Sequence, residues 1–386
     1  MEKELLRLSE SNYFDQERCV GEMISYVALD ENTEDHILQH AISLSEQIRQ
    51  GKKTLIEELL CGYDLNQAEG MALLCLTEAL LRVDDKETIN LLLEDKLHGK
   101  NWVDSLQQSS FLMKIASLGL ATAGKSVKVS EANWLSKTVA SVGAPMVRTV
   151  MKQAIHHISN DFILGNDIDE ALKRSESFLK DGYLFSYDIL GESSRSAAQS
   201  EFYYQEYIKT IEKLGKANGK NANIFSHNNI SVKLSALHPR VELLKKDVLK
   251  SELYPKLKHL ISLSKKHGVC IIFDAEESYR SDIYMHVLYD MLSDKEFKDF
   301  EGIGLVIQAY QKRTFYLLDK IIDMAKSFKR KIPIRLVKGA YWDTEVKHSQ
   351  MMGLKDYPVF THKKFTDVCY VATAKKMIEN VEYIYP

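Results

Sequence analysis

The chain has 386 residues, a formal net charge of −3 and 45% apolar residues, a composition typical of soluble globular proteins. So small a net charge gives no electrostatic argument for binding nucleic acid or an acidic membrane surface. The five cysteines are far apart and form no CxxC pair, so they indicate neither a zinc cluster nor a disulfide framework. We therefore predict no metal site, and a reducing cytoplasm is the expected location. The longest apolar stretch, residues 111–124, is shorter than the roughly 20 residues that a membrane span needs.

Residues 1 to about 175 are predicted to be helical almost throughout, because Pro145 is the only proline among them. Between Asp35 and Gly51, apolar residues recur at helical spacing, and the glycine is placed to end the helix. We expect a helical arm over residues 1–60 and a helical α-domain over residues 61–175.

After about residue 180, short apolar runs alternate with helical stretches. Five runs have the composition of strands: YLFSYD, ISVKLS, VCIIFD, IGLVIQ and IPIRLVKGAYW. Polar residues stand at or near their ends, namely Asp188, Lys233, Asp274, Gln308, Arg335 and Lys338. A last helix is expected from about Phe365 to Asn380, and VEYIYP is expected to begin a sixth strand. Strands that alternate with single helices predict a parallel sheet.

Two architectures accommodate such a sheet. A doubly wound sheet usually carries a glycine-rich phosphate turn after its first strand, and this sequence has neither that turn nor a Walker A motif. Polar residues at the carboxyl ends of all five strands instead favour a (β/α)8 barrel, whose active site is built from those ends. The predicted fold class is therefore α/β, a TIM-type barrel over residues 176–386 with about five to six strands present.

The run KIPIRLVKGAYW carries one cation, Arg335, in its middle and another, Lys338, toward its end. If a strand runs from Ile334 to Tyr341, alternation directs Arg335, Val337 and Gly339 to one face and Leu336, Lys338 and Ala340 to the other. An arginine buried on such a strand requires an anionic or hydrogen-bonding partner. The alternative is an edge strand with one solvated face. In ISVKLS the same alternation places Ser231, Lys233 and Ser235 together.

Gathered at one barrel mouth, the six polar residues at the strand ends would combine three cations, two carboxylates and an amide. That mixture does not suit a metal ion, but it does suit an anionic ligand such as a flavin with its pyrophosphate. Lys233 is predicted to point into the barrel, either poised for chemistry or paired with Asp274 as a structural link. Tyr341 and Trp342 are either walls of a pocket or packing residues.

Four stretches resemble the proline dehydrogenase barrel of bacterial bifunctional proline utilisation flavoproteins: ISVKLSALHPR, DAEE, IQAYQKR and RLVKGAYWDTEVK. FSYDILGE, MALLCLTEALLRVDDKETINLLLEDK and YPVFTHKKFTDVCYVATAKK are also similar, so the resemblance covers nearly the whole chain. It implies a (β/α)8 barrel with noncovalent FAD, preceded by helical segments. The implied reaction is hydride transfer from C5 of L-proline to flavin N5, which gives Δ1-pyrroline-5-carboxylate, with a membrane quinone as electron acceptor.

The resemblance also assigns residues by position. The positions that line the proline site are Lys233, Asp188, Tyr341 and Ala340. The positions that contact the flavin are Asp274, Gln308, Arg335, Val337, Lys338, Gly339, Ala340 and Trp342, with Thr361 toward the adenosine end. Glu192 resembles the acidic partner of a gating arginine, and it is expected to lack that partner in this chain.

The family continues past the position of Pro386 into further strands and a helix with paired arginines that bind the proline carboxylate. We therefore expect this polypeptide by itself to be an incomplete barrel and, as a consequence, an incomplete enzyme. One alternative is a non-catalytic fragment that serves only as a binding module. Another is an unrelated lyase with Lys233 as a Schiff base.

The expected partners are L-proline and a quinone. No ribbon-helix-helix segment precedes the arm, so no nucleic-acid partner is expected. Homo-oligomer formation, and peripheral association with the inner membrane as in the full-length family, stay open.

Overall fold

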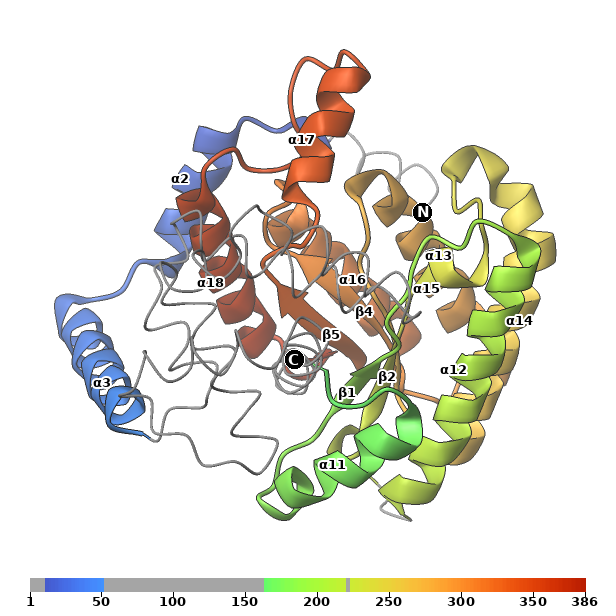
Figure 1. The fold of residues 1–386 in the computed structure, drawn as a ribbon. Helices are drawn as coiled ribbons and strands as arrows, with labels where there is room; N and C mark the ends of the chain where they lie inside the picture. The colour runs from blue at the N-terminus through green and yellow to red at the C-terminus, as the bar shows by residue number, and fades with distance from the viewer. Residues whose placement is uncertain (1–10, 52–162, 220–222) are drawn as a thin grey trace, which may run out of the picture. The chain divides into compact units, whose positions relative to one another are not determined.

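The computed structural model describes residues 11–51, 163–219 and 223–386 (Figure 1). The chain divides into two compact units, one formed by residues 1–34 and 175–386 and the other by residues 35–174. Residues 61–162 of the predicted α-domain lie outside the described residues.

The first unit is built on six parallel strands that neighbour one another in chain order. They are β1 (Ser186–Asp188), β2 (Asn229–Val232), β3 (Ile271–Phe273), β4 (Ile303–Gln308), β5 (Ile332–Val337) and β6 (Ile384–Tyr385). Because all five pairings are parallel, the strands end at the same edge of the sheet. This arrangement confirms the predicted parallel sheet of an α/β barrel-type fold.

Helices join the strands, and the longer ones lie around the sheet, whereas α17 (Trp342–Met351) projects away from it (Figure 1). They are α12 (Ala197–Asn218), α13 (Leu234–Leu237), α14 (Lys246–His267), α15 (Ser281–Ser293), α16 (Thr314–Phe328), α17 (Trp342–Met351) and α18 (Lys363–Glu379). Short 3-10 turns complete the connections: η2 (Ile224–Ser226), η3 (Leu243–Lys245), η4 (Ser278–Arg280) and η5 (Lys295–Phe297). Before the strands come η1 (Ser11–Tyr13), α2 (Gln16–Val27), α3 (Glu31–Gln50) and α11 (Ile168–Lys180).

Local sequence signals explain several helix boundaries. Ser196 precedes α12, and its hydroxyl accepts a hydrogen bond from the Gln199 backbone N–H at 3.2 Å. Helix α14 ends where Gly268 adopts a left-handed conformation with φ of 65°. The predicted helix end at Gly51 is confirmed, since α3 stops at Gln50, and α18 lies close to its predicted range.

Helix α2 packs against α18, as Figure 1 also shows. Cys19, Val20 and Met23 are buried in one apolar cluster with Phe360 and Cys369. Polar bonds surround that cluster: the Tyr316 hydroxyl donates to Glu22 at 2.6 Å, and the Lys375 ammonium donates to the Tyr26 carbonyl at 2.8 Å. Helix α2 is thus attached to α16 and α18.

Two predicted strands are shorter than expected. Strand β5 ends at Val337, and α17 begins at Trp342, so the expected strand from Ile334 to Tyr341 is wrong in its second half. The chain leaves the sheet at Gly339, whose φ of 137° is open chiefly to glycine. Similarly, β2 ends at Val232, and Ser235 belongs to α13 instead of continuing the strand.

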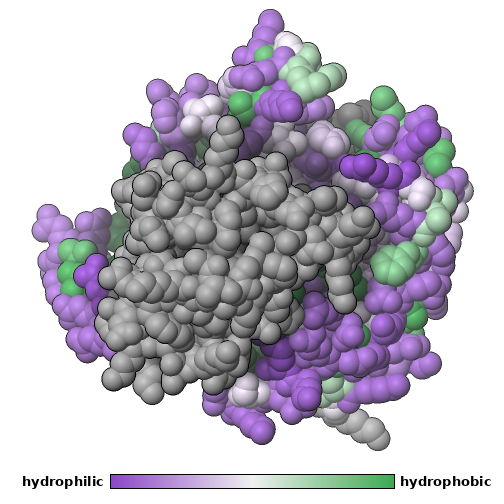
Figure 2. Space-filling model, viewed as in Figure 1, coloured by the Kyte–Doolittle hydropathy of each residue, from purple (hydrophilic) through white to green (hydrophobic). Residues whose placement is uncertain are grey.

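Most of the described surface in Figure 2 is hydrophilic, with apolar residues scattered among polar ones. Within the described ranges, no helix is both long and apolar enough to span a bilayer.

Candidate active site

The carboxyl ends of β1, β2 and β3 meet at an ion cluster around one buried lysine. Lys233 follows β2 and is only 8% exposed. Its ammonium donates to Asp188 Oδ1 and Oδ2 at 2.7 and 2.8 Å, and it also lies 2.8 Å from Asp274 Oδ2. The predicted pair of Lys233 with Asp274 is therefore present. The prediction that Lys233 points into the barrel describes the same side-chain position.

The carboxylates keep Lys233 charged. Burial alone would lower the pKa of the Lys233 ammonium, but Asp274 and Asp188 outweigh that effect and raise it above its usual value. Burial also raises the pKa of Asp188, and the Lys233 ammonium opposes that rise. A Schiff-base lysine must be a neutral amine when it attacks. This environment therefore argues against the lyase hypothesis.

Arg335 extends the ion cluster to β5. Its Nη2 donates to Asp274 Oδ1 at 2.8 Å and to Ser231 Oγ at 3.1 Å, while Nη1 donates to Ser186 Oγ at 3.2 Å. Two cations and two carboxylates are thus linked across four strands. Of the three guanidinium nitrogens of Arg335, only Nε is buried without a hydrogen-bond partner.

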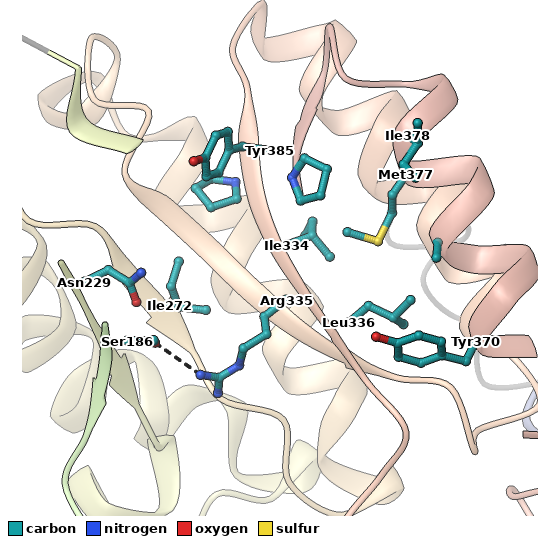
Figure 3. A pocket seen from close by; sticks show the side chains of 13 residues that line it. Ser186, Asn229, Ile272, Ile334, Arg335, Leu336, Tyr370, Met377, Ile378 and Tyr385 are labelled. Carbon is teal, nitrogen blue, oxygen red and sulfur yellow. Dashed lines mark hydrogen bonds between the residues drawn. The ribbon is translucent and has the colours of Figure 1, made fainter. Parts of the chain in front are cut away.

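A cavity of about 420 Å³ opens beside Arg335 (Figure 3). Arg335, Ser186 and Asn229 line one side, and residues of α18 such as Tyr370 and Met377 line the other. The remaining lining is largely apolar: Ile272, Pro333, Ile334, Leu336, Ala374, Ile378, Tyr385 and Pro386. An apolar hollow with a few convergent polar groups is typical of small-molecule sites.

Gln308 ends β4 and is held in one orientation. Its Nε2 donates to the Glu276 carbonyl at 2.8 Å, and its Oε1 accepts from the Ala340 backbone N–H at 3.3 Å. Gly339 lies against Tyr310, because a Cβ at that glycine would stand 2.4 Å from Tyr310 Cγ. The loop after β5 therefore approaches β4 closely, as its glycine predicts.

Tyr341 and Glu192 form a second pair at the mouth. The Tyr341 hydroxyl donates to Glu192 Oε2 at 2.8 Å. The expectation that Glu192 would be without any partner is therefore wrong, because a tyrosine from the loop after β5 bonds it. Burial, followed by the Glu192 contact, raises the pKa of Tyr341 well above its usual value.

Three predicted site residues direct their side chains elsewhere. Lys338 bonds Asp367 on α18, on the face opposite Arg335, as the alternation within the strand predicted. It is therefore not part of the ion cluster, which contradicts the expected gathering of all six polar residues. Trp342 Nε1 donates to the Phe360 carbonyl at 2.8 Å, and Thr361 donates to Gln16 of α2 at 3.0 Å through its hydroxyl.

The sequence reasoning missed several buried polar residues around the cluster. The backbone N–H of Lys233 donates to the hydroxyl of Tyr207, a fully buried residue of α12, at 3.1 Å. Glu276 and Tyr284 were also missed. A weak signal existed for Glu276, because it stands two residues after Asp274 in the DAEE stretch, whereas a tyrosine inside an amphipathic helix gives none.

A family model for proline dehydrogenase matches residues 171–386, a range that includes all six strands. The chain belongs to the proline dehydrogenase family. This confirms the resemblance noted in the motifs.

A second model, the DNA-binding domain of proline dehydrogenase, matches residues 55–162, which lie outside the described residues. Its description contrasts with the expectation that nucleic acid is not a partner.

Curated relatives of this family are considerably longer. The bifunctional proteins PutA of Klebsiella aerogenes and Escherichia coli are each 40% identical to this chain over 357 residues, which is 90% of this chain and 27% of theirs. A crystal structure of a Bradyrhizobium japonicum proline utilization A variant has a TM-score of 0.70 at 36% identity, covering 97% of this chain and 38% of that one. The chain thus spans about a quarter of the length of these curated relatives.

Proposed function

We propose that this chain carries the proline dehydrogenase activity of its family and oxidises L-proline to Δ1-pyrroline-5-carboxylate with FAD. The observation that carries the proposal is the ion cluster of the buried Lys233 with Asp188, Asp274 and Arg335 at the strand ends of a proline dehydrogenase barrel. Such a cluster, beside an apolar cavity, suits a small zwitterion and an anionic cofactor.

The residues around Arg335 fit a flavin. Arg335 Nε keeps a free donor in a buried position, and Gly339 lets the loop after β5 come close to its neighbours without a side chain. Gln308 uses one donor and one acceptor of its amide, so one N–H remains available. The family resemblance assigns the flavin contacts to Asp274, Gln308, Arg335, Val337, Lys338, Gly339, Ala340, Trp342 and Thr361. Of these, the side chains of Lys338, Trp342 and Thr361 hydrogen-bond other residues in this structure. When bound, FAD supplies a two-electron acceptor for the hydride.

The chain's own residues would bind and orient proline. In the reaction the C5–H bond breaks, its electron pair leaves as hydride, the ring nitrogen forms the C=N bond, and the remaining nitrogen proton goes to water. Proline must therefore enter with a neutral amine. Lys233 stays protonated between its two carboxylates, so its proposed role is electrostatic, with Asp188, Ala340, Tyr341 and Glu192 shaping the proline side of the site.

The test is direct reduction of bound flavin. The purified chain is incubated with FAD, passed through gel filtration and mixed anaerobically with L-proline. We expect a visible flavin band to co-elute with the protein and to bleach when proline is added. A flavin band that is retained but does not respond to L-proline would overturn the proposed reaction, and loss of all flavin would overturn the cofactor assignment for this chain.

A matched pair of lysine variants adds specificity to this test. Lys233→Met removes the buried ammonium, and Lys258→Met removes a surface ammonium that lies 2.7 Å from Asp294 and whose side chain is 47% exposed. We expect slow or absent bleaching in Lys233→Met and unchanged bleaching in Lys258→Met.

The proposal includes a quinone as the final electron acceptor, as the family resemblance implies. The proposed location is the cytoplasm, with peripheral contact to the inner membrane during quinone reduction. Proline-dependent reduction of a soluble quinone analogue by the flavin-loaded chain would measure this step.

A further inference from the structure

Glu276 is a buried carboxylate that the proposed reaction does not use. It lies in the loop after β3, two residues beyond Asp274, and is only 2% exposed. Its side chain hydrogen-bonds Ser235 of α13 and Tyr284 of α15. A carboxylate so deeply buried requires several hydrogen bonds to offset the loss of water.

Four donors from three segments converge on this carboxylate. Oε1 accepts from the Ser235 hydroxyl and from Arg280 Nη1, the latter at 3.2 Å. Oε2 accepts from the Tyr284 hydroxyl and from the Ser235 backbone N–H, the latter at 3.3 Å. Each oxygen thus receives two hydrogen bonds.

The direction of each bond follows from the other contacts of the donors. The Ser235 hydroxyl accepts from the Ser193 backbone N–H at 2.9 Å, and the Tyr284 hydroxyl accepts from the Leu234 backbone N–H at 3.3 Å. Both hydroxyl hydrogens are therefore available to Glu276. Burial raises the pKa of the Glu276 carboxyl, but Arg280 and these hydrogen bonds oppose the rise.

Through these bonds Glu276 reaches the mouth at three places. The backbone N–H groups of Leu234 and Ser235, directly after Lys233, are held by Tyr284 and Glu276. The Glu276 carbonyl orients the Gln308 amide, which in turn holds the Ala340 N–H.

The third place is the loop after β1. The Ser235 hydroxyl holds Ser193, the neighbour of Glu192, and Ser193 sits at a φ of 53°, which is unusual for a residue other than glycine. The ends of β1 and β2 are therefore linked to the Glu276 carboxylate, and those of β4 and β5 to the backbone carbonyl of the same residue.

We propose that Glu276 is a positioning residue that sets, from a single buried point, the turn carrying Lys233 and the orientation of the Gln308 amide. The inference rests on the proposed function only for the roles of Lys233 and Gln308 in binding proline and flavin. The arrangement itself is a property of the polypeptide and is present without FAD.

The isosteric change Glu276→Gln is the sharpest perturbation. An amide has one oxygen and one NH2 group, and whichever side the NH2 takes, it faces an N–H that cannot accept a hydrogen bond. On one side this is Arg280 Nη1 and on the other the Ser235 backbone N–H, so rotation of the amide does not remove the conflict. The contacts to Ser235 and Tyr284 must loosen, and the backbone carbonyl that orients Gln308 must shift with them.

The measurement is hydrogen–deuterium exchange of the chain without flavin, read by mass spectrometry. We expect exchange to become about tenfold faster in peptides that contain Leu234, Ser235 and Ala340, the size expected for one lost hydrogen bond. Peptides from the middle of α14 and α18 should exchange as in the unchanged chain. Equal exchange at Ala340, or acceleration throughout the sheet and helices, would overturn a positioning role.

Glu277→Gln is the matched control. It makes the same chemical change at the neighbouring residue, whose carboxylate lies 3.5 Å from Arg280 but has no bond to Ser235, Tyr284 or Gln308. We expect unchanged exchange at Leu234 and Ala340 in this variant. Acceleration equal to that in Glu276→Gln would attribute the effect to Arg280 and overturn the proposal.

Tyr284→Phe provides a second variant if Glu276→Gln does not fold. It removes one donor to Glu276 and the acceptor of the Leu234 N–H without adding a donor. The proposal requires faster exchange at both Leu234 and Ala340, although Ala340 has no bond to Tyr284. An effect confined to Leu234 would overturn it. Because no flavin is present, this outcome is independent of whether proline reduces FAD.

Discussion

Gly339→Ala is the change whose cost can be worked out most directly. Gly339 has a φ of 137°, a region in which residues with a side chain are strained by roughly 1–3 kcal/mol. A Cβ there would also lie 2.4 Å from Tyr310 Cγ. That ring cannot easily move aside, because Tyr310 is 2% exposed and its hydroxyl donates to Glu345 Oε1 at 3.2 Å. Overpacking of this kind costs roughly 1–3 kcal/mol more, so we expect a total loss of about 2–6 kcal/mol.

The assay is urea denaturation monitored by circular dichroism, with Gly353→Ala as the control. Gly353 also has a positive φ, 63°, but a Cβ there would meet nothing within 4 Å. The control should lose only about 1 kcal/mol, from backbone strain alone. The difference between the two variants measures the contact with Tyr310. If Gly339→Ala costs no more than Gly353→Ala, the close approach of the loop after β5 to β4 is refuted. Retention of FAD should weaken in Gly339→Ala and stay unchanged in Gly353→Ala.

The other predictions concern the buried charges and thiols. Lys233→Met leaves the carboxylates of Asp188 and Asp274 facing each other without the ammonium between them. We expect the free energy of unfolding to fall by about 2–4 kcal/mol, after allowing for partial solvent screening of Asp188, and by less than about 1 kcal/mol in the control Lys258→Met. Equal losses of stability in thermal unfolding would contradict an ion cluster around a buried Lys233. Burial raises the pKa of the Cys270 thiol to about 12, so the neutral thiol is favoured in the folded chain, and the stability this contributes is present below the usual thiol pKa and is lost as pH rises toward 12. We therefore expect iodoacetamide near pH 8 to leave Cys270 unmodified in the native chain and to label it in urea, as measured by mass spectrometry; native labelling at the rate of a free thiol would disprove its burial.

The ion cluster could be predicted in large part because its members follow local rules. Alternation along the runs after residue 180 correctly placed Lys233 beside Ser231 and placed Arg335 on the face opposite Lys338. The parallel sheet then brought Asp188, Lys233 and Asp274 to one edge. The error was to count Lys338 in that cluster although its own strand directs it to α18.

The loops after the strands escaped prediction for a different reason. Glu192 was expected to lack a partner, yet Tyr341 lies 149 residues away in the chain and bonds it. Glu276 and Ser235 are 41 residues apart, and neither belongs to a periodic pattern that would announce the contact. A hydrogen bond between two loops depends on where both backbones turn, and those turns are set by packing and by conformations such as that of Gly339.

The sequence by itself determined the alternating apolar runs, the polar residues that end them and, through their motifs, membership of the proline dehydrogenase family. Period-two and period-3.6 patterns are local properties that the chain carries before it folds. Only the tertiary structure decided that Lys233 is held by two carboxylates, that Tyr341 meets Glu192 and that Glu276 links four strand ends. Those contacts join segments that are remote in sequence, so they form only when the sheet assembles. The assembled sheet also buries polar groups, and each buried polar group then requires a hydrogen-bond partner.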